Sequence, residues 1–350
     1  MSKRKSKNRN AHLSAACVAV LAGGSFLLAP TRADESLQRF VFEKAAMGVP
    51  FRITLYAPAE ATAKAAADAA FERVAVLNSI LSDYDPDSEL SRLARTSGQG
   101  KIVPVSSILW TVLERGQALA ERTGGAFDLT VGPLVNVWRR ARRKGELPAP
   151  ELLAETRARI GYRHVRLHPS AKSVELLEPE MRLDPGGIAK GLAVDEALAV
   201  LEQRGLTRAL VAASGDIAAG DPPPGQPGWR VEVAALDAPD APPPQIVHLE
   251  SRAISTSGDV FQRVEIGGKR YSHIVNPHTG IGLTDHSLVT VVAPDGITAD
   301  SLATAVSVLG PEQGLKLIEE TPGTAAQIVR QPGERIERLE SSRWKEEVVP

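Results

Sequence analysis

The sequence predicts an α+β protein in which mixed, largely antiparallel sheets pack against helices. Residues 51–56 alternate between apolar and polar side chains, which is the pattern of a half-buried strand. Residues 59–81 are rich in alanine and carry larger apolar residues at helical spacing, which predicts a long helix. Short strand patterns on either side of turns such as Gly267-Gly268 indicate hairpins, because a parallel sheet would show a regular alternation of strands and helices.

The elements expected in the first half of the chain follow from this periodicity and from turn residues. Tyr84 lies in a turn-rich loop after the first helix, and Gly124-Gly125 ends a later one. In chain order we expect a strand at 40–57, helices at 59–81, 88–95 and 107–123, a helical second half of 141–161, and a hairpin of 165–167 with 173–177.

The second half of the chain is expected to contain most of the antiparallel strands. Proline-rich loops at 221–228 and 237–245 separate these strands. The expected elements are a helix at 188–203, strands at 209–212, 230–233, 246–249, 252–255, 263–266 and 288–293, a helix at 298–309, and a last hairpin of 325–330 with 335–339.

The composition excludes several classes of protein. The chain has 350 residues, 41 Lys and Arg against 42 Asp and Glu, and 43% apolar residues, so it is neither disordered nor a nucleic-acid binder with a broad basic surface. A single cysteine excludes an intramolecular disulfide framework and a multi-cysteine metal site. The length permits one large domain or two ordinary ones.

The N-terminal residues have the pattern of a secretory signal peptide. Five basic residues within 3–9 precede an apolar stretch at about 13–29, and small residues at Thr31 and Ala33 precede the first acidic residues. We therefore expect residues 1–33 to be cleaved off after Ala33, and residues 34–350 to form a single catalytic unit that has one or two lobes. The alternative is an uncleaved membrane anchor. Removing six of the 41 bases leaves 35 against 42 acids, a formal charge of about −7.

A glycine turn at residues 184–191, with the sequence DPGGIAKG, precedes one of the expected helices. Glycines permit close approach of a ligand to the backbone, and the free N–H groups of a helix start bind phosphate. Lys190 lies in the first helical turn, where its ammonium group can reach the same anion. The alternative interpretation is an ordinary turn followed by a helix cap.

Two further polar stretches are candidates for a site. Ser214-Gly215-Asp216 follows a buried strand, which is a common position for ligand-binding residues. His273 lies in the sequence YSHIVNPHTG, and an imidazole can titrate near neutral pH, so His273 is a candidate general base. A simple turn and a hydrogen-bonded structural histidine are the respective alternatives.

Asp300 and Thr304 stand four residues apart in an expected helix, so their side-chain oxygens lie on one face. A carboxylate and a hydroxyl are hard ligands that suit Mg²⁺. The alternative is that Asp300 only stabilises the start of the helix through its charge.

Taken together and in chain order, these stretches resemble the ApbE family, the FAD:protein FMN transferases. The resemblance extends over about residues 40–320, nearly all of the chain after the expected signal. Seven stretches carry it: MGVPF at 47–51, LSDYDPDSELSRL at 81–93, GAFD at 125–128, DPGGIAKG at 184–191 with the following Val194-Asp195, SGD at 214–216, SHIVNPHTG at 272–280, and VTVVAPDGITADSLATAVSVLG at 289–310.

The resemblance implies a T-fold-like ApbE architecture and a Mg²⁺-dependent transfer of FMN from FAD to a Thr or Ser hydroxyl of a target flavoprotein, with release of AMP. It implies that Asp300, Thr304 and the carbonyl of Gly187 hold the metal. It also implies that His273 and Asp300 are catalytic, with His273 activating the acceptor hydroxyl. The residues implied to line the FAD site are Met47, Tyr84, Ala126, Phe127, Asp128, Asp184, Lys190 and Ile274.

The resemblance leaves two other functions open. The same site would serve an FAD pyrophosphatase that releases FMN and AMP, and a non-catalytic flavin-binding protein is the third hypothesis. The expected partners are FAD and an acceptor flavoprotein of an exported or membrane electron-transfer system, without nucleic acid. The expected location is the bacterial periplasm, where the protein would contact the inner membrane only through the acceptor or an uncleaved signal.

Overall fold

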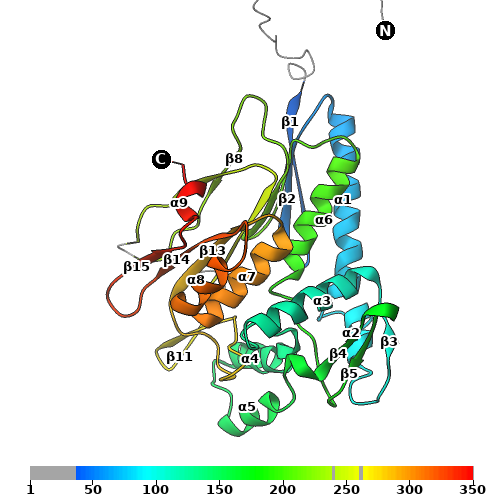
Figure 1. Cartoon of the computed structure of the whole chain (residues 1–350), viewed down its shortest axis with the longest axis vertical. Helices are drawn as coiled ribbons and strands as arrows, with labels where there is room; N and C mark the ends of the chain where they lie inside the picture. Colours follow the sequence, from blue (N-terminus) through cyan, green and yellow to red (C-terminus); the bar gives the residue numbers. More distant parts are fainter. Residues whose placement is uncertain (1–36, 239–240, 260–262, 350) are drawn as a thin grey trace, which may run out of the picture. The chain divides into compact units, whose positions relative to one another are not determined.

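An eight-stranded antiparallel sheet is the centre of the fold (Figure 1). The computed structural model describes residues 37–238, 241–259 and 263–349. The strands lie in the order β1-β2-β6-β7-β10-β13-β14-β15, which confirms the predicted α+β class with largely antiparallel strands. Their bounds are β1 (Gln38–Ala46), β2 (Val49–Ala57), β6 (Ala209–Ala213), β7 (Asp216–Ala219), β10 (Arg252–Gly258), β13 (Ser287–Ala293), β14 (Ala325–Arg330) and β15 (Glu337–Glu340).

The first two strands form a hairpin, although the sequence predicted one strand over residues 40–57. The alternation of apolar and polar side chains continues on both sides of the turn, so it does not reveal where β1 ends and β2 begins. Met47 and Gly48 turn the chain with φ of 48° and 78°. Glycine adopts this left-handed conformation without steric cost, and Gly48 has no atom near the position that a Cβ would take.

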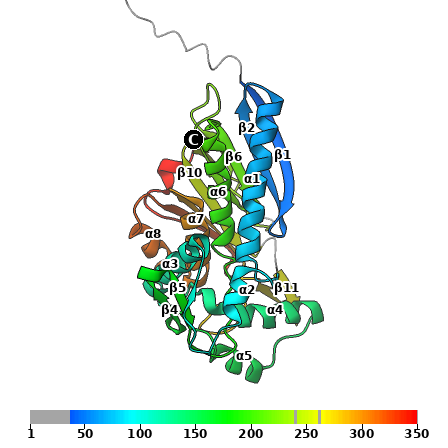
Figure 2. The same ribbon diagram turned by 90° about the vertical axis from the view of Figure 1, so that its right-hand side faces the viewer.

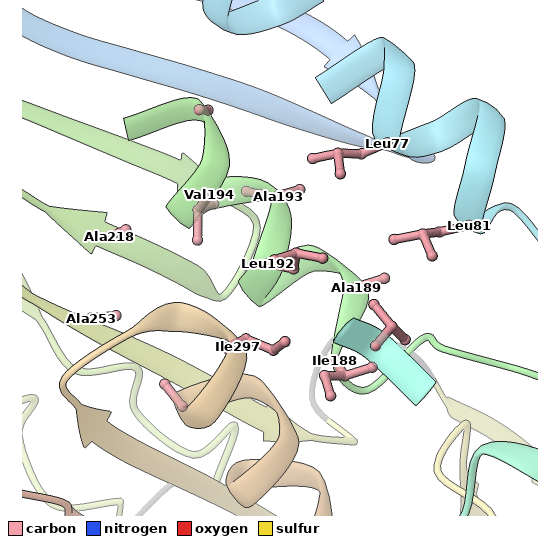
Figure 3. Packing of buried hydrophobic residues seen from close by; sticks show 14 of the residues in the cluster. Leu77, Leu81, Ile188, Ala189, Leu192, Ala193, Val194, Ala218, Ala253 and Ile297 are labelled. Atoms are coloured by element: carbon pink, nitrogen blue, oxygen red, sulfur yellow. The ribbon is translucent and has the colours of Figure 1, made fainter. Parts of the chain in front are cut away.

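Three helices cover one face of the sheet: α1 (Glu60–Leu81), α6 (Ala189–Gln203) and α7 (Gly296–Leu309). Figure 2 shows α1 and α6 running side by side along the strands. In Figure 3, Leu77 and Leu81 of α1 lie beside α6, and Ile297 of α7 lies on the other side of α6. Alanines form much of the buried face of α1, so this helix approaches its neighbours closely.

The opposite face of the sheet is also buried. Neighbouring residues of one strand, such as Ala253 and Ile254 of β10, belong to different apolar clusters on the two sides. The second cluster contains Trp229 and Trp344, which come from the hairpin of β8 (Trp229–Glu232) with β9 (Ile246–Leu249) and from α9 (Trp344–Glu347). Residues 230–233 and 246–249 therefore do not join the main sheet, although the sequence predicted one antiparallel set.

Most of the remaining helices and small sheets gather beyond one end of α1 and α6 (Figures 1 and 2). One of them, the helix that contains Trp138, was not predicted from the sequence. The indole N–H of Trp138 donates to the Gly280 carbonyl at 2.8 Å. These elements are α2 (Glu89–Ala94), α3 (Ser107–Arg122), α4 (Gly132–Lys144), α5 (Pro150–Arg157), the sheet of β3 (Val103–Pro104), β5 (Ser173–Leu176) and β4 (Val165–His168), and the hairpin of β11 (Arg263–Ile266) with β12 (Lys269–Ser272). The helix α8 (Pro311–Glu319) lies elsewhere, beside α7, and packs against β14 (Figure 1).

The expected signal peptide, residues 1–33, and the single cysteine, Cys17, lie outside the described residues. Among the residues that the structure describes, no helix combines the length and the apolar character that crossing a bilayer requires.

The helices α6 and α7 meet backbone to backbone at two glycines. A Cβ on Gly191 would lie 2.1 Å from the Gly296 carbonyl oxygen and 2.7 Å from Cβ of Asp300, and a Cβ on Gly296 would lie 2.5 Å from the Gly191 carbonyl oxygen. Only glycine at both positions permits this separation of the helix axes.

We expect Gly191→Ala to destabilise the protein by about 3 kcal/mol, because the new methyl group forces α6 and α7 apart. The measurement is urea unfolding at neutral pH. Gln203→Ala, at an exposed position of the same helix, should change the free energy of unfolding by less than about 0.5 kcal/mol. Equal stabilities for the two variants would contradict the close contact.

Candidate functional site

Four of the residues singled out by sequence meet where the start of α6 faces α7. Asp300 is 2% exposed, and its carboxylate accepts the backbone N–H of Gly191 at 3.0 Å. The other carboxylate oxygen lies 3.8 Å from Nζ of Lys190. Thr304 follows one turn later on the same face, and a Cβ on Gly187 would lie 2.7 Å from its hydroxyl. Gly187, Lys190, Asp300 and Thr304 therefore form one cluster, which we call the α6–α7 cluster.

Asp216 completes the charges of the α6–α7 cluster. Lys190 donates to its carboxylate at 2.6 Å, and Ser255 donates to the second oxygen at 2.6 Å. Asp216 lies opposite Ser255 in the pairing of β7 with β10, so the sheet register fixes both groups. The sequence pattern placed Asp216 in a polar turn, and its pairing with Lys190 was not predicted.

The hydroxyl of Thr304 has a second polar neighbour in Ser257, whose Oγ lies 3.5 Å away. Ser257 is on β10, two residues beyond Ser255, and therefore on the same face of the sheet. Together with its neighbours Asp216, Ser255 and Ser257, the α6–α7 cluster thus presents two carboxylates and several hydroxyl groups around one ammonium group.

Burial and neighbouring charges shift the pKa values of the ionisable groups in the α6–α7 cluster. Burial raises the pKa of Asp300 to about 7, the nearby Asp216 carboxylate adds to the rise, and Lys190 opposes it. Burial alone would lower the pKa of Lys190, but the carboxylates of Asp300 and Asp216 overcome this and raise it. With both carboxylates ionised, the cluster has one uncompensated negative charge, which favours binding of a cation.

A second group of predicted residues surrounds Arg139 of α4. Its guanidinium group pairs with Asp83 at 2.5 Å, lies 3.5 Å from Asp184, and covers the ring of Tyr84 at 4.1 Å from the centroid. Asp184 also accepts the N–H of Gly186 at 2.8 Å, so Arg139 connects α4 to the glycine turn. Tyr84 as a whole is 76% exposed.

The predicted residues Ala126, Phe127 and Asp128 are buried at the end of α3. One carboxylate oxygen of Asp128 accepts the N–H and hydroxyl of Thr130, and the other accepts the N–H of Tyr162 at 2.8 Å. Burial is the main reason that the pKa of Asp128 is raised. The Asp128 carboxylate therefore holds together two segments of the chain.

Three predicted residues lie on other elements. Met47 is in the β1–β2 turn and packs against the main apolar core. His273 and Ile274 follow β12, and Ile274 is 9% exposed. Among the residues that the structure describes, no hydrogen bond or ion pair joins Met47 or Ile274 to the α6–α7 cluster.

Asp195 of α6 binds the start of α7 and so helps to fix the two helices that carry the α6–α7 cluster. It was not selected as a site residue from the sequence. Its two carboxylate oxygens accept the N–H groups of Gly296 and Ile297 at 2.6 and 2.9 Å, at the start of α7. Burial raises the pKa of Asp195 to about 7, although these two N–H groups oppose the rise.

We expect Asp195→Asn to reduce the pH dependence of stability. The folded-state pKa is the higher one, so the contribution of Asp195 to stability is fully present below pH 4 and is lost as the pH rises through 7. The free energy of unfolding of the wild type minus that of the variant should therefore fall between pH 5 and pH 8 in urea titrations. If this difference stays constant or grows with pH, ionisation of Asp195 does not destabilise the folded protein, and the prediction is wrong.

Two features define the class of this protein: a central eight-stranded antiparallel sheet with α1, α6 and α7 on one face, and a buried cluster of oxygen and ammonium groups beside a glycine turn. The chain belongs to the ApbE family, whose sequence profile matches residues 47–328. This confirms the resemblance predicted from the sequence.

Relatives and solved structures agree with this assignment. The chain is 30% identical over 339 residues to the FAD:protein FMN transferase of Klebsiella pneumoniae (strain 342), covering 93% of this chain and 96% of that protein. It is 34% identical over 258 residues to that of Vibrio cholerae serotype O1, covering 73% and 76%. The structure of the flavin transferase ApbE from Vibrio cholerae superposes with a TM-score of 0.80 at 28% identity, covering 89% of this chain and 99% of that one.

Proposed function

We propose that this protein is an FAD:protein FMN transferase, which moves FMN from FAD to a Thr or Ser hydroxyl of a target flavoprotein and releases AMP. The observation that carries the proposal is the convergence of Gly187, Lys190, Asp300 and Thr304 in the α6–α7 cluster of an ApbE family member. All four come from the stretches that resemble the family's motifs, and Thr304 lies one helical turn beyond Asp300.

The α6–α7 cluster has the donor set that Mg²⁺ prefers. Asp300 offers a carboxylate, Thr304 a hydroxyl, and the backbone of Gly187 lies close to that hydroxyl. Mg²⁺ is usually bound by one or two carboxylates together with substrate phosphates, so one aspartate is sufficient here. Asp300, Thr304 and the Gly187 carbonyl would hold the ion. When bound, it supplies positive charge to the pyrophosphate of FAD.

The reaction is a phosphoryl transfer, in which the protein positions groups and neutralises charge. The acceptor hydroxyl oxygen forms a bond to the FMN phosphorus, and the bond from that phosphorus to the oxygen of AMP breaks. We assign the acceptor proton to His273. Lys190 and the N–H groups of the glycine turn stabilise negative charge on the phosphate oxygens.

The flavin and adenine parts of FAD need an apolar and aromatic lining. Tyr84 offers an exposed ring for stacking, and Arg139 holds this ring beside the glycine turn. Asp128 fixes the backbone near Phe127 through its hydrogen bonds. We propose that FAD contacts Met47, Tyr84, Ala126, Phe127, Asp128, Asp184, Lys190 and Ile274.

We further propose that residues 34–350 are the catalytic unit and that residues 1–33 direct export to the periplasm. The acceptor would then be a flavoprotein of an exported or membrane electron-transfer system.

One experiment tests the proposed function against its alternatives. The protein without residues 1–33 is incubated with FAD, Mg²⁺ and a candidate acceptor domain, and AMP and the acceptor mass are followed. A mass gain of one FMN together with AMP supports transfer. AMP without the mass gain supports an FAD pyrophosphatase, and FAD binding without AMP would leave only a flavin-binding protein.

A further inference from the structure

A groove of about 850 Å³ lies between α2, α4 and α5, and the segment 179–183 closes one side. None of the four residues of the α6–α7 cluster lines it. Asp83 and Tyr84 stand at its edge, and both contact Arg139, which also lies near Asp184. The groove is therefore separate from the α6–α7 cluster but adjoins the glycine turn through these contacts.

The lining of the groove carries excess positive charge. Both of its carboxylates are in ion pairs: Asp83 with Arg139, and Glu180 with Arg159 at 2.6 Å. Within the described ranges of the chain, Arg140 and Arg182 form no ion pair or side-chain hydrogen bond. The charged residues of the lining are Asp83, Arg95, Arg140, Arg159, Glu180 and Arg182.

The positive charge continues along α4 beyond the groove. Arg142, Arg143 and Lys144 form the last turn of this helix. Across the parts of the chain that the structure describes, these three side chains also form no ion pair. Residues 34–350 have a formal charge of about −7, since removing six of the 41 bases leaves 35 against 42 acids, so this basic surface contrasts with the rest of the chain.

Exposed apolar side chains border the same groove. Tyr84 is 76% exposed and Leu152 of α5 is 42% exposed, and both line it. Apolar and aromatic side chains beside arginines are typical of surfaces that bind a polypeptide.

We propose that this groove binds an acidic polypeptide segment of the acceptor protein and so brings the acceptor to the flavin site. This inference rests on the proposed function, because the transfer of FMN requires a protein to reach the glycine turn. A groove of this volume accommodates several side chains. Arg140 and Arg182 are exposed side chains that line this groove. A flat lipid surface does not enter a groove, whereas an extended polypeptide segment does, so the shape of the lining favours a polypeptide over a membrane.

The test uses charge reversal in the groove and a matched reversal elsewhere. The first variant is Arg140→Glu with Arg182→Glu. The control is Arg39→Glu with Arg335→Glu, which changes the charge equally at two exposed arginines outside the groove. The probes are a fluorescent peptide with one Thr among Asp and Glu residues, and the same peptide with Asn and Gln in their place. Binding is followed by anisotropy at low ionic strength.

We expect the wild type and the control to bind the acidic peptide about tenfold more tightly than the neutral one, and the groove variant to lose this preference. Raising the salt concentration should weaken the binding of the acidic peptide to the wild type but not to the groove variant. Equal binding of the two peptides by the wild type, or an acidic preference that persists in the groove variant, would overturn the proposal.

Two further measurements exclude other occupants. If the groove variant raises the KM for FAD in AMP formation without an acceptor, the groove belongs to the FAD site and the proposal is wrong. If it loses binding to phosphatidylglycerol vesicles while keeping the acidic peptide, the groove binds lipid and the proposal is equally wrong. The peptide assay needs no turnover, so a protein that binds the peptide through these arginines but forms no AMP would contradict only the proposed function.

Discussion

Asp300→Asn is expected to lower FAD-dependent AMP formation by about 10³-fold at saturating Mg²⁺. Asparagine keeps an oxygen that can accept the N–H of Gly191, so the junction of the two helices is preserved. The substitution removes the negative charge of the proposed metal ligand. Because Asp300 is 2% exposed, water cannot replace the lost carboxylate oxygen as a ligand.

The measurement is chromatographic quantification of AMP, together with the melting temperature of the variant. Ser307→Ala is a suitable control, because Ser307 lies on the same helix and its hydroxyl donates only to the Ala303 carbonyl. AMP formation by Asp300→Asn within tenfold of the wild type would refute the assignment of Asp300 as a ligand.

Lys190→Met is expected to have the largest effect on stability, a loss of about 3–5 kcal/mol. Methionine keeps most of the apolar chain but removes the ammonium group. The carboxylates of Asp216 and Asp300, with side chains that are 4% and 2% exposed, would then remain buried without a counter-charge.

The measurement is urea unfolding at pH 8, above the pKa of about 7 of Asp300 in the wild type. Lys64→Met is the matched control: it breaks the ion pair with Asp68, whose partners are 63% and 57% exposed, and should change stability by less than about 0.5 kcal/mol. A loss below 1 kcal/mol in Lys190→Met would mean that the buried charges are compensated by other groups.

The elements that the sequence predicted well are those with strong local patterns. The helix α1 was predicted over nearly its full length, since its apolar residues recur at helical spacing and its end is marked by a turn-rich loop. The helix α4 was missed because its apolar residues are interrupted by five basic ones, and its buried Trp138 packs against the distant Tyr271. Such a helix is stabilised by tertiary contacts that no local pattern reveals.

The site shows the same division between local and distant information. Asp300 and Thr304 were found together because helical spacing places them on one face. The pairing of Lys190 with Asp216, 26 residues apart, depends on the packing of α6 against β7, which no local pattern reveals. The role of Asp195 likewise requires the contact of two helices whose residues are 101 positions apart.

The backbone contact between Gly191 and Gly296 has a consequence for which parts of this protein tolerate change. Two helices that touch at their main chains cannot slide or separate, so the groups between them are preorganised before any substrate arrives. The proposed metal ligands are thereby held at one junction of α6 with α7. The elements α2, α4 and α5 contribute no residue to that junction, so substitutions there can change which acceptor is recognised while the reaction stays the same.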